Sequence, residues 1–499
     1  MRDGSRGILT AGLASSALIA LLGTAAAQPS PPAKEPVEEQ DEPPPVDGPA
    51  EEQDEPPPFE LLRYDEDHSY LRDLARRTGN LLALEPLKYL PFDDAGDVYL
   101  SLGGEIRLRY EFYDDRRFGR SPEPPDGYLL QRYLLHGDLH LGASFRTFLQ
   151  LRGAFTSFRD GPPVPTNADG FDVQQAFFDV GTGRRQREPA LLTLRVGRQE
   201  LSYGTERLVS VREATNVHRA FDAARALGAF AGWRVDGFFG RLVQNEIDRF
   251  DPWFQRDTNF WGVYGTGAIW SAAGMNLDVY YLGVERPDAA FDQGTARELR
   301  HTFSARLFGE LEGLEYDLEG MYQGGEFGAH RIRAWAAASD AGYTFRTLPL
   351  TPRIGARANV ASGDQDPRDR TLGTFNPLFP RGNYFGESAI VGPVNLFDVH
   401  PLVQLSLLES LVFEAGWAIF WRYSTADGFY DNRLDLIQAA DGSERRLIGS
   451  ELSLVLDWTL GRHLSARGSY SHFFTGPFLK DTGPGSDANA VIVFGAYHF

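Results

Sequence analysis

Charged side chains recur at every second position in several stretches of the sequence. In GGEIRLRYEF, residues 103–112, Glu105, Arg107, Arg109 and Glu111 share one parity, and the other parity is apolar or glycine. Because a guanidinium can bind a carboxylate through two parallel hydrogen bonds, arginines in such a row could hold an anionic ligand. They could equally pair with neighbouring carboxylates and only stiffen the wall that carries them.

An alternation with a period of two predicts a β-strand with one polar and one apolar face. The same parity argument places further polar residues on the polar faces of later strands. They are Arg132, His136, Asp138, His140, Arg146, Gln150, Arg152, Arg195, Arg306, Glu315, Asp317, Glu319, Arg331, Arg333, Arg353, Arg357, Glu414, Arg422, Glu451 and Asp457. The polar faces therefore carry both signs of charge, with arginine prominent.

Such strands recur from residue 97 to residue 499, and we expect about 18 of them. Their connections alternate in length: 243–258, 285–298, 361–396 and 424–446 are long, whereas the intervening turns are short. Sorting of this kind is typical of a transmembrane antiparallel β-barrel with long extracellular loops and short periplasmic turns. The predicted fold class is therefore all-β.

In a transmembrane barrel, one face of each strand contacts lipid and the other lines the lumen. An arginine at the bilayer midplane costs about 2–4 kcal/mol, so the apolar parity must face lipid and the charged parity must line the lumen. The residues that we predict to line a substrate path are Glu105, Arg107, Arg109, Arg132, Asp138, Arg146, Arg152, Arg195, Arg353 and Arg357.

The two ends of the chain agree with an outer-membrane location. Arg2 and Arg6 precede an apolar run at 8–22 and three alanines at 25–27, which is typical of a secretory signal peptide over residues 1–27. The last strand ends on the aromatic Phe499. We therefore predict the bacterial outer membrane as the location, with its lipid as a partner.

Two segments separate the signal peptide from the barrel. Residues 28–58 are acidic and proline-rich, with EEQDEPPP repeated at 38–45 and 51–58, and we expect them to be disordered. Residues 59–96 mix short apolar clusters with charge. We predict that they form a periplasmic lead-in, with one helical turn near residues 71–77, and that residues 97–499 form the barrel.

A charged passage at 196–225 allows two interpretations: a loop that folds into the pore and narrows it, or a solvated extracellular loop. The residues that could form such a constriction are Arg198, Glu200, Arg207, Arg212 and Asp222, together with Glu213, His218 and Arg219. The long segment 361–396 is a second candidate lid.

Enzymatic and metal-binding motifs are absent from the sequence. It has no cysteine, no Gly-x-Ser-x-Gly elbow, no phosphate-binding loop and no paired-histidine zinc motif. His136 and His140 would lie about 13 Å apart along one strand, too far to share a metal. We expect no catalysis, no cofactor, no metal and no nucleic-acid partner.

Several stretches resemble the alginate export family. They are RYDEDHSYLRD and LKYLPF in the lead-in, GGEIRLRYEF, VGRQELSYGTERLVSVREATNVHRAFDAAR at 196–225 and FNPLFPRGNYFGE at 375–387. The resemblance covers roughly residues 60–499 and implies an 18-stranded channel with a constriction of lumenal arginines that selects uronate polymers. Arg107, Arg109, Arg152, Arg195, Arg353 and Arg357 match that role. The short turn at 460–464 departs from the family's long periplasmic gating loop.

Three functions remain open. The first is export or passage of an anionic polysaccharide such as alginate, together with periplasmic secretion scaffold proteins. The second is a porin for uptake of small anionic nutrients. The third is a structural barrel with little conductance, whose acidic arm binds partners.

Overall fold

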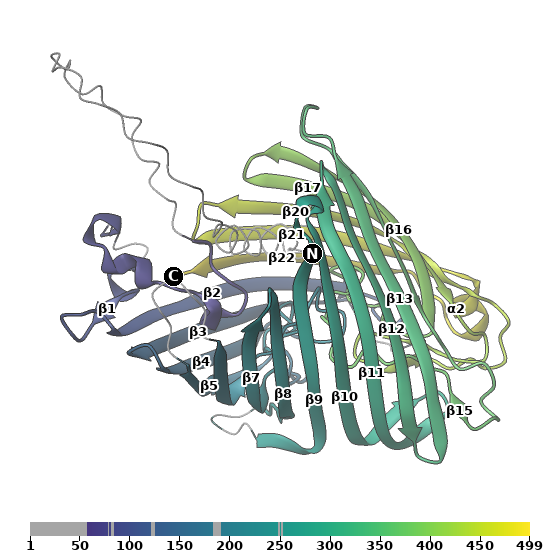
Figure 1. The fold of residues 1–499 in the computed structure, drawn as a ribbon. Coiled ribbons are helices and arrows are strands. Elements are labelled where there is room, and N and C mark those ends of the chain that lie inside the picture. Colours follow the sequence, from purple (N-terminus) through teal and green to yellow (C-terminus); the bar gives the residue numbers. More distant parts are fainter. Residues whose placement is uncertain are drawn as a thin grey trace, which may run out of the picture.

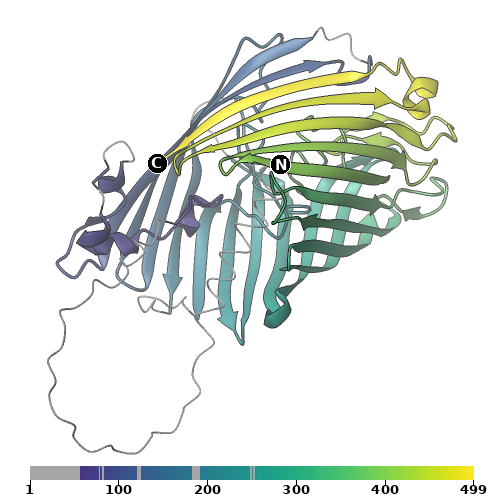
Figure 2. The same ribbon diagram turned by 90° about the horizontal axis from the view of Figure 1, so that it is seen from above.

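The computed structural model describes residues 57–77, 79–80, 84–120, 125–182, 191–247, 250 and 253–499. The predicted signal peptide and residues 28–56 lie outside this part of the chain. The described residues form a tilted antiparallel barrel (Figures 1 and 2). None of its helices is long and apolar enough to cross a membrane.

Eighteen strands make the barrel wall in the described part of the chain. They are β2 (Val98–Asp114), β3 (Asp126–Leu141), β4 (Phe145–Ser157), β5 (Asp169–Gly181), β6 (Leu192–Gln199), β7 (Phe221–Phe230), β8 (Trp233–Gln244), β9 (Trp253–Trp270), β10 (Met275–Phe291), β11 (Gly294–Leu311), β12 (Leu314–Phe327), β13 (His330–Thr344), β14 (Arg353–Ala361), β16 (Leu396–Leu408), β17 (Leu411–Arg422), β20 (Leu447–Leu460), β21 (Leu464–Thr475) and β22 (Ala488–His498). Each pairs with the next, and β22 pairs with β2, which closes the wall. The predicted all-β barrel is confirmed.

Several shorter strands and helices lie outside the 18 barrel strands. β1 (Leu90–Pro91) and β15 (Thr371–Leu372) extend the sheet, β18 (Phe429–Tyr430) and β19 (Leu436–Gln438) form a ribbon, and α2 is Pro477–Thr482. The 3-10 helices are η1 (Arg63–Asp65), η2 (Ser69–Arg72), η3 (Leu74–Arg76), η4 (Glu85–Leu87) and η5 (Ser271–Ala273). The turn predicted near residues 71–77 is therefore two short 3-10 helices.

At the seam between β2 and β22, side chains alternate between the outer and inner faces, and backbone hydrogen bonds close the barrel. On β2, Leu108 is 47% exposed on the outer face, whereas Arg107 is 2% and Arg109 is 3% exposed on the inner face. Beyond β22, Phe499 and Gly104 exchange two backbone hydrogen bonds, of 2.8 and 3.1 Å. The C-terminal residue therefore completes the ladder that closes the barrel.

The prediction of a long loop at 285–298 is wrong. β10 continues to Phe291 and β11 begins at Gly294, so only two residues separate the strands. The register shifts between Arg286 and Ala289, where Pro287 lacks a backbone donor. Above the hydrocarbon a strand needs no apolar face, so this polar sequence can extend the ladder. The predicted loop at 243–258 is also shorter, because β9 begins at Trp253.

The lumenal placement of Arg331 and Arg333 is wrong as well. Both are exposed, on the same face of β13 as Trp335, while Ile332 is buried. Alanine occupies both faces of β13, so its hydropathy gives little indication of parity. The inward side is decided by Asp340, which pairs with an arginine of β14.

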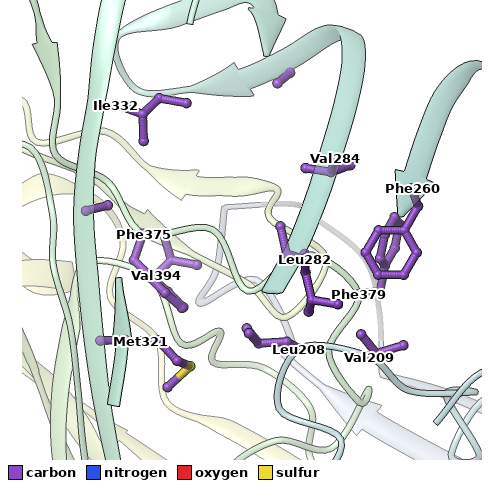
Figure 3. Packing of buried hydrophobic residues seen from close by; sticks show 14 of the residues in the cluster. Leu208, Val209, Phe260, Leu282, Val284, Met321, Ile332, Phe375, Phe379 and Val394 are labelled. Carbon is purple, nitrogen blue, oxygen red and sulfur yellow. The ribbon is translucent and has the colours of Figure 1, made fainter. Parts of the chain in front are cut away.

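Two segments between strands fill the barrel interior. We call residues 200–220 the first inner loop and residues 362–395 the second inner loop. Leu208 and Val209 of the first, and Phe379 and Val394 of the second, pack with strand residues such as Phe260 in the largest buried apolar cluster (Figure 3). The barrel interior is therefore packed at this level.

Candidate functional site

The inner loops are joined to each other by their backbones. Val209 and Phe379 form a parallel β-bridge. The Ser210 amide donates to the Phe379 carbonyl at 3.0 Å, and the Phe379 amide donates to the Leu208 carbonyl at 3.0 Å. A third bond runs from the Arg381 amide to the Glu206 carbonyl at 3.1 Å. The structure thus places the first inner loop inside the barrel rather than in extracellular solvent.

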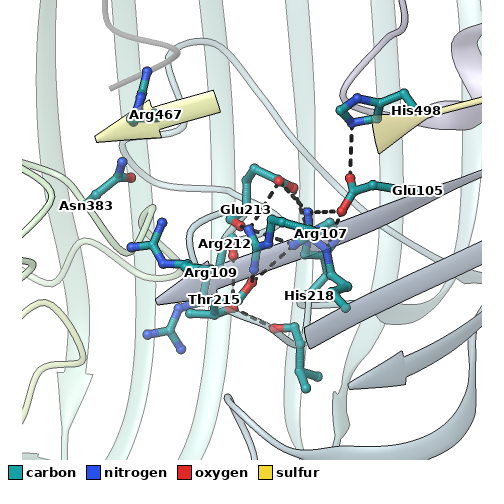
Figure 4. Close-up of polar contacts among 12 residues, drawn as sticks. Glu105, Arg107, Arg109, Arg212, Glu213, Thr215, His218, Asn383, Arg467 and His498 are labelled. Carbon is teal, nitrogen blue, oxygen red and sulfur yellow. Dashed lines mark hydrogen bonds and ion pairs between the residues drawn. The ribbon is translucent and has the colours of Figure 1, made fainter. Parts of the chain in front are cut away.

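Two wall arginines hold the first inner loop, and Figure 4 shows one of them, Arg107, beside Glu213 and Thr215. Arg107 donates to the carbonyls of Glu213 and Thr215, both at 2.6 Å. Arg132 donates to the same carbonyls at 3.2 and 3.1 Å and pairs with the carboxylates of Glu105 and Glu213. The imidazole of His218 lies between the carboxylates of Glu213 and Glu200, both within the loop. The loop is therefore fastened to β2 and β3.

The other wall arginines predicted to line a substrate path are also buried beside carboxylates. The nitrogen-to-oxygen distances are 2.6 Å for Arg109–Glu111, 2.7 Å for Arg146–Asp138, 2.8 Å for Arg195–Asp179, 2.9 Å for Arg353–Glu315 and 3.0 Å for Arg357–Asp340, and Arg152 pairs with Asp169. Because a paired and buried guanidinium has little charge left for another anion, these arginines stiffen the wall in this conformation.

The residues predicted to form a constriction separate into two groups. Arg198 and Asp222 lie on β6 and β7 as a cross-strand pair at 2.9 Å, so they flank the first inner loop without belonging to it. Glu200, Arg207 and Arg212 belong to the loop. Arg207 reaches Asp317 and Glu319 on β12, at 2.7 and 2.8 Å.

Four arginines gather where the inner loops meet: Arg212, Arg219, Arg286 and Arg381, here called the junction arginines. Arg219 and Arg286 lie over the ring of Phe379, at 5.2 and 5.1 Å from its centre. Arg219 donates to the Phe379 carbonyl at 2.6 Å, and Arg286 donates to the carbonyl of Leu378 at 3.1 Å. These partners are neutral carbonyl groups.

The junction arginines differ from the wall arginines in charge compensation. Among the described residues, none of the four has a carboxylate within ion-pair distance. Burial and the neighbouring Arg433 lower the pKa of Arg212 to about 10. Burial, with Arg212 and Arg286 nearby, holds the pKa of Arg219 well below its usual value. Within the described residues, the junction arginines therefore lack a carboxylate in ion-pair contact, although Glu206, Glu298, Asp431 and Asp435 attract them from a longer distance.

Sequence reasoning missed two of these four residues. Arg212 and Arg219 lie in the charged passage at 196–225, whose density of charge indicated a possible constriction. Arg286 and Arg381 lie in segments expected to be extracellular loops. Their convergence depends on where those segments fold, which no local pattern encodes.

The lead-in reaches the first inner loop from the other end of the barrel. Tyr64 is 3% exposed, with its ring 5.3 Å from that of Phe177 and 4.2 Å from the Arg195 guanidinium. Its hydroxyl donates to the Glu200 carbonyl at 2.9 Å, so the lead-in touches the first inner loop. Arg63 donates to the carbonyls of Gly104 and Phe499 at the seam, at 3.0 and 3.1 Å.

The lead-in lies beside the C-terminus, at the end of the barrel with the short turns (Figure 1). Within the part of the chain that the structure describes, no group of three His, Asp or Glu side chains is placed to hold a metal ion.

The sequence and the fold were compared with those of known proteins. A family model described as "Alginate export" matches residues 98–494. OpdK of Pseudomonas aeruginosa superimposes with a TM-score of 0.55 at 10% identity, covering 80% of this chain and 99% of that one. OpdK with vanillate gives 0.54 at 11% identity, over 80% and 98%. OccK2 of the same organism, in complex with glucuronate, gives 0.51 at 11% identity, over 83% and 98%. No curated protein matches the sequence.

Proposed function

This chain belongs to the alginate export family of outer-membrane β-barrel channels, and we propose that it conducts sugar acids of the uronate type past the junction arginines. The observation that carries the proposal is the contrast in charge between wall and junction. Wall arginines are buried beside carboxylates, whereas Arg219 and Arg286 of the junction donate to carbonyl groups. A solute carboxylate can supply the ion-pair contact that the junction arginines lack among the described residues.

The aromatic ring at the junction supports a sugar-sized solute. Phe379 has two guanidiniums over it, from the first inner loop and from β10. Bidentate binding by Arg219 or Arg286 would hold a carboxylate, and the wall beside it is apolar. A narrow lumen with low-dielectric walls also strengthens attraction for anions.

Size favours a small uronate over a long polymer in this conformation. The inner loops are joined by backbone hydrogen bonds, and the lead-in lies beneath them. The related channels OccK2 and OpdK bind glucuronate and vanillate, as their structures are described. Uptake or passage of small anions is therefore the function that the geometry supports best.

Export of a polymer such as alginate is the second candidate, supported by the family. It requires both inner loops and the lead-in to leave the lumen. In that case we propose that periplasmic secretion scaffold proteins bind the lead-in, at residues 59–96, and hold it away from the barrel.

Conductance across planar bilayers tests the proposal. We expect the wild-type channel to prefer anions and glucuronate to reduce its chloride current. Arg219→Ala with Arg286→Gln should abolish the preference and raise the half-blocking glucuronate concentration about tenfold, since one charge-assisted bond contributes about 1.5–3 kcal/mol. Arg219→Lys keeps the charge and should retain the preference, which separates charge from loop packing.

Arg353→Ala is the matched control, because in the described part of the chain the ion-pair partners of this wall arginine are carboxylates of β12 and β13. It should leave selectivity unchanged. A cation-selective channel that ignores glucuronate and is unaltered by Arg219→Ala would contradict the proposal. Block by a long polyuronate, without block by glucuronate, would favour polymer export instead.

A further inference from the structure

The outer wall has a groove that faces the membrane. It has a volume of about 870 Å³ and lies over β12, β13, β14 and β16. Gly320 pairs across strands with Ala337, and Ala358 pairs with Val399; all four residues line the groove. A side chain at Gly320 would meet no atom within 4 Å. Small residues thus replace the larger apolar residues of the surrounding wall.

The aromatic residues show how the groove lies in the bilayer. Trp335 and Tyr322 pair across strands above it, and Tyr343 lies eight residues further along β13. That separation is about 26 Å along the strand, which at the usual tilt is close to the height of the apolar band. The groove therefore lies at the depth of the acyl chains, and its upper end opens towards the extracellular leaflet.

Three outward arginines surround the upper end. Arg331 and Arg333 lie just above Trp335 on β13, and Arg446 lines the groove itself beside Tyr423. Tyr423 in turn contacts the ring of Trp335 edge-on at 5.7 Å. These arginines are at the level of lipid headgroups.

Their lack of carboxylate partners sets these arginines apart. Arg297 and Arg445, which are exposed at the same end of the barrel, have carboxylate oxygens at 2.5 and 2.8 Å. In the described part of the chain, Arg331, Arg333 and Arg446 have none within ion-pair distance. Arg446 donates to the backbone carbonyl of Arg422 at 3.2 Å and to that of Tyr423.

We propose that this groove binds lipid A, the phosphorylated glycolipid of the outer leaflet. One acyl chain lies over Gly320, Ala337 and Ala358, and the two headgroup phosphates are bound by the three arginines. Guanidinium groups match phosphate geometry and remain charged at the membrane surface.

The charges argue against a second copy of the chain as the occupant. A two-fold dimer through this face would place the same three arginines against each other. A phosphate-bearing lipid instead brings both the apolar chain and the negative charge that the surface lacks. This inference concerns the outer face and does not depend on what the lumen conducts.

Native mass spectrometry of the full channel in mild detergent tests the proposal. The probes are lipid A, monophosphoryl lipid A and phosphatidylglycerol. We expect one lipid A per barrel, with binding at least tenfold weaker for monophosphoryl lipid A and for phosphatidylglycerol. Arg333→Ala with Arg446→Ala should weaken lipid A binding at least tenfold, and Ala337→Leu with Ala358→Leu should abolish the bound lipid.

Matched controls are Arg297→Ala, which removes a carboxylate-paired arginine, and Ala226→Leu, on the outer face of β7. Both should bind lipid A as the wild type does, and every variant should conduct normally, because none of these residues lines the lumen. Equal binding of the three lipids, or wild-type binding by the groove variants, would overturn the proposal. So would a stable dimer that Ala358→Leu disrupts.

Discussion

Arg107→Ala should open the channel. Arg107 donates two hydrogen bonds to carbonyls of the first inner loop, both at 2.6 Å, and its side chain is 2% exposed. Hydrogen bonds from a charged donor contribute about 1.5–3 kcal/mol each. Arg132 keeps weaker bonds to the same two carbonyls, so the low end of that range applies. The docked loop should lose about 3 kcal/mol relative to the released loop.

A change of about 3 kcal/mol multiplies the ratio of released to docked loop by about a hundred. The removal leaves no buried charge unpaired, because Arg132 still pairs with Glu213. Single-channel recording should therefore show a large rise in open probability. The barrel itself should remain folded, as judged by its resistance to unfolding in detergent.

Arg353→Ala serves as the comparison for this experiment too. It removes an equally buried arginine whose partners, Glu315 and Asp340, are on the wall. Its open probability should match that of the wild type. The reasoning is refuted if Arg107→Ala conducts no more than the wild type, or if both variants open the channel to the same degree.

Three other changes test separate parts of the structure. Tyr64→Ala removes the lead-in contact with Glu200 and should raise conductance, whereas Tyr64→Phe should have a smaller effect; equal currents in all three proteins would contradict this. Burial, and the nearby carboxylate of Asp427, raise the pKa of Asp364 to about 6, so docking of the second inner loop is favoured at low pH and weakens as pH rises through 6. Open probability should therefore increase from pH 4.5 to pH 7, and Asp364→Asn should remove that dependence. Deletion of Phe499 removes two backbone bonds at the seam and should slow barrel closure, measured as a heat-modifiable band shift during refolding; an unchanged rate would count against the seam's role.

Much of the wall could be predicted from the sequence, because strand periodicity has a direct energetic consequence in a membrane. A slip of one residue on β2 would move Arg107 and Arg109 into lipid, so alternation alone indicates which face is inward. Alternation gave a wrong result on β13. Alanine occupies both faces of that strand, and the prediction placed Arg331 and Arg333 inside although they lie outside. It also failed at residues 285–298, which lie above the hydrocarbon and need no apolar face.

The state of the lumen was decided only by the tertiary structure. Arg107 and Arg219 have the same chemistry in the sequence, yet Arg107 fastens a loop, whereas Arg219 donates to a backbone carbonyl and has no ion pair with a carboxylate of the described residues. Whether an arginine is paired with a carboxylate depends on strand register and on the positions of two loops that are far apart in the chain. Local periodicity determines which way a side chain points, whereas long-range folding determines what it meets there.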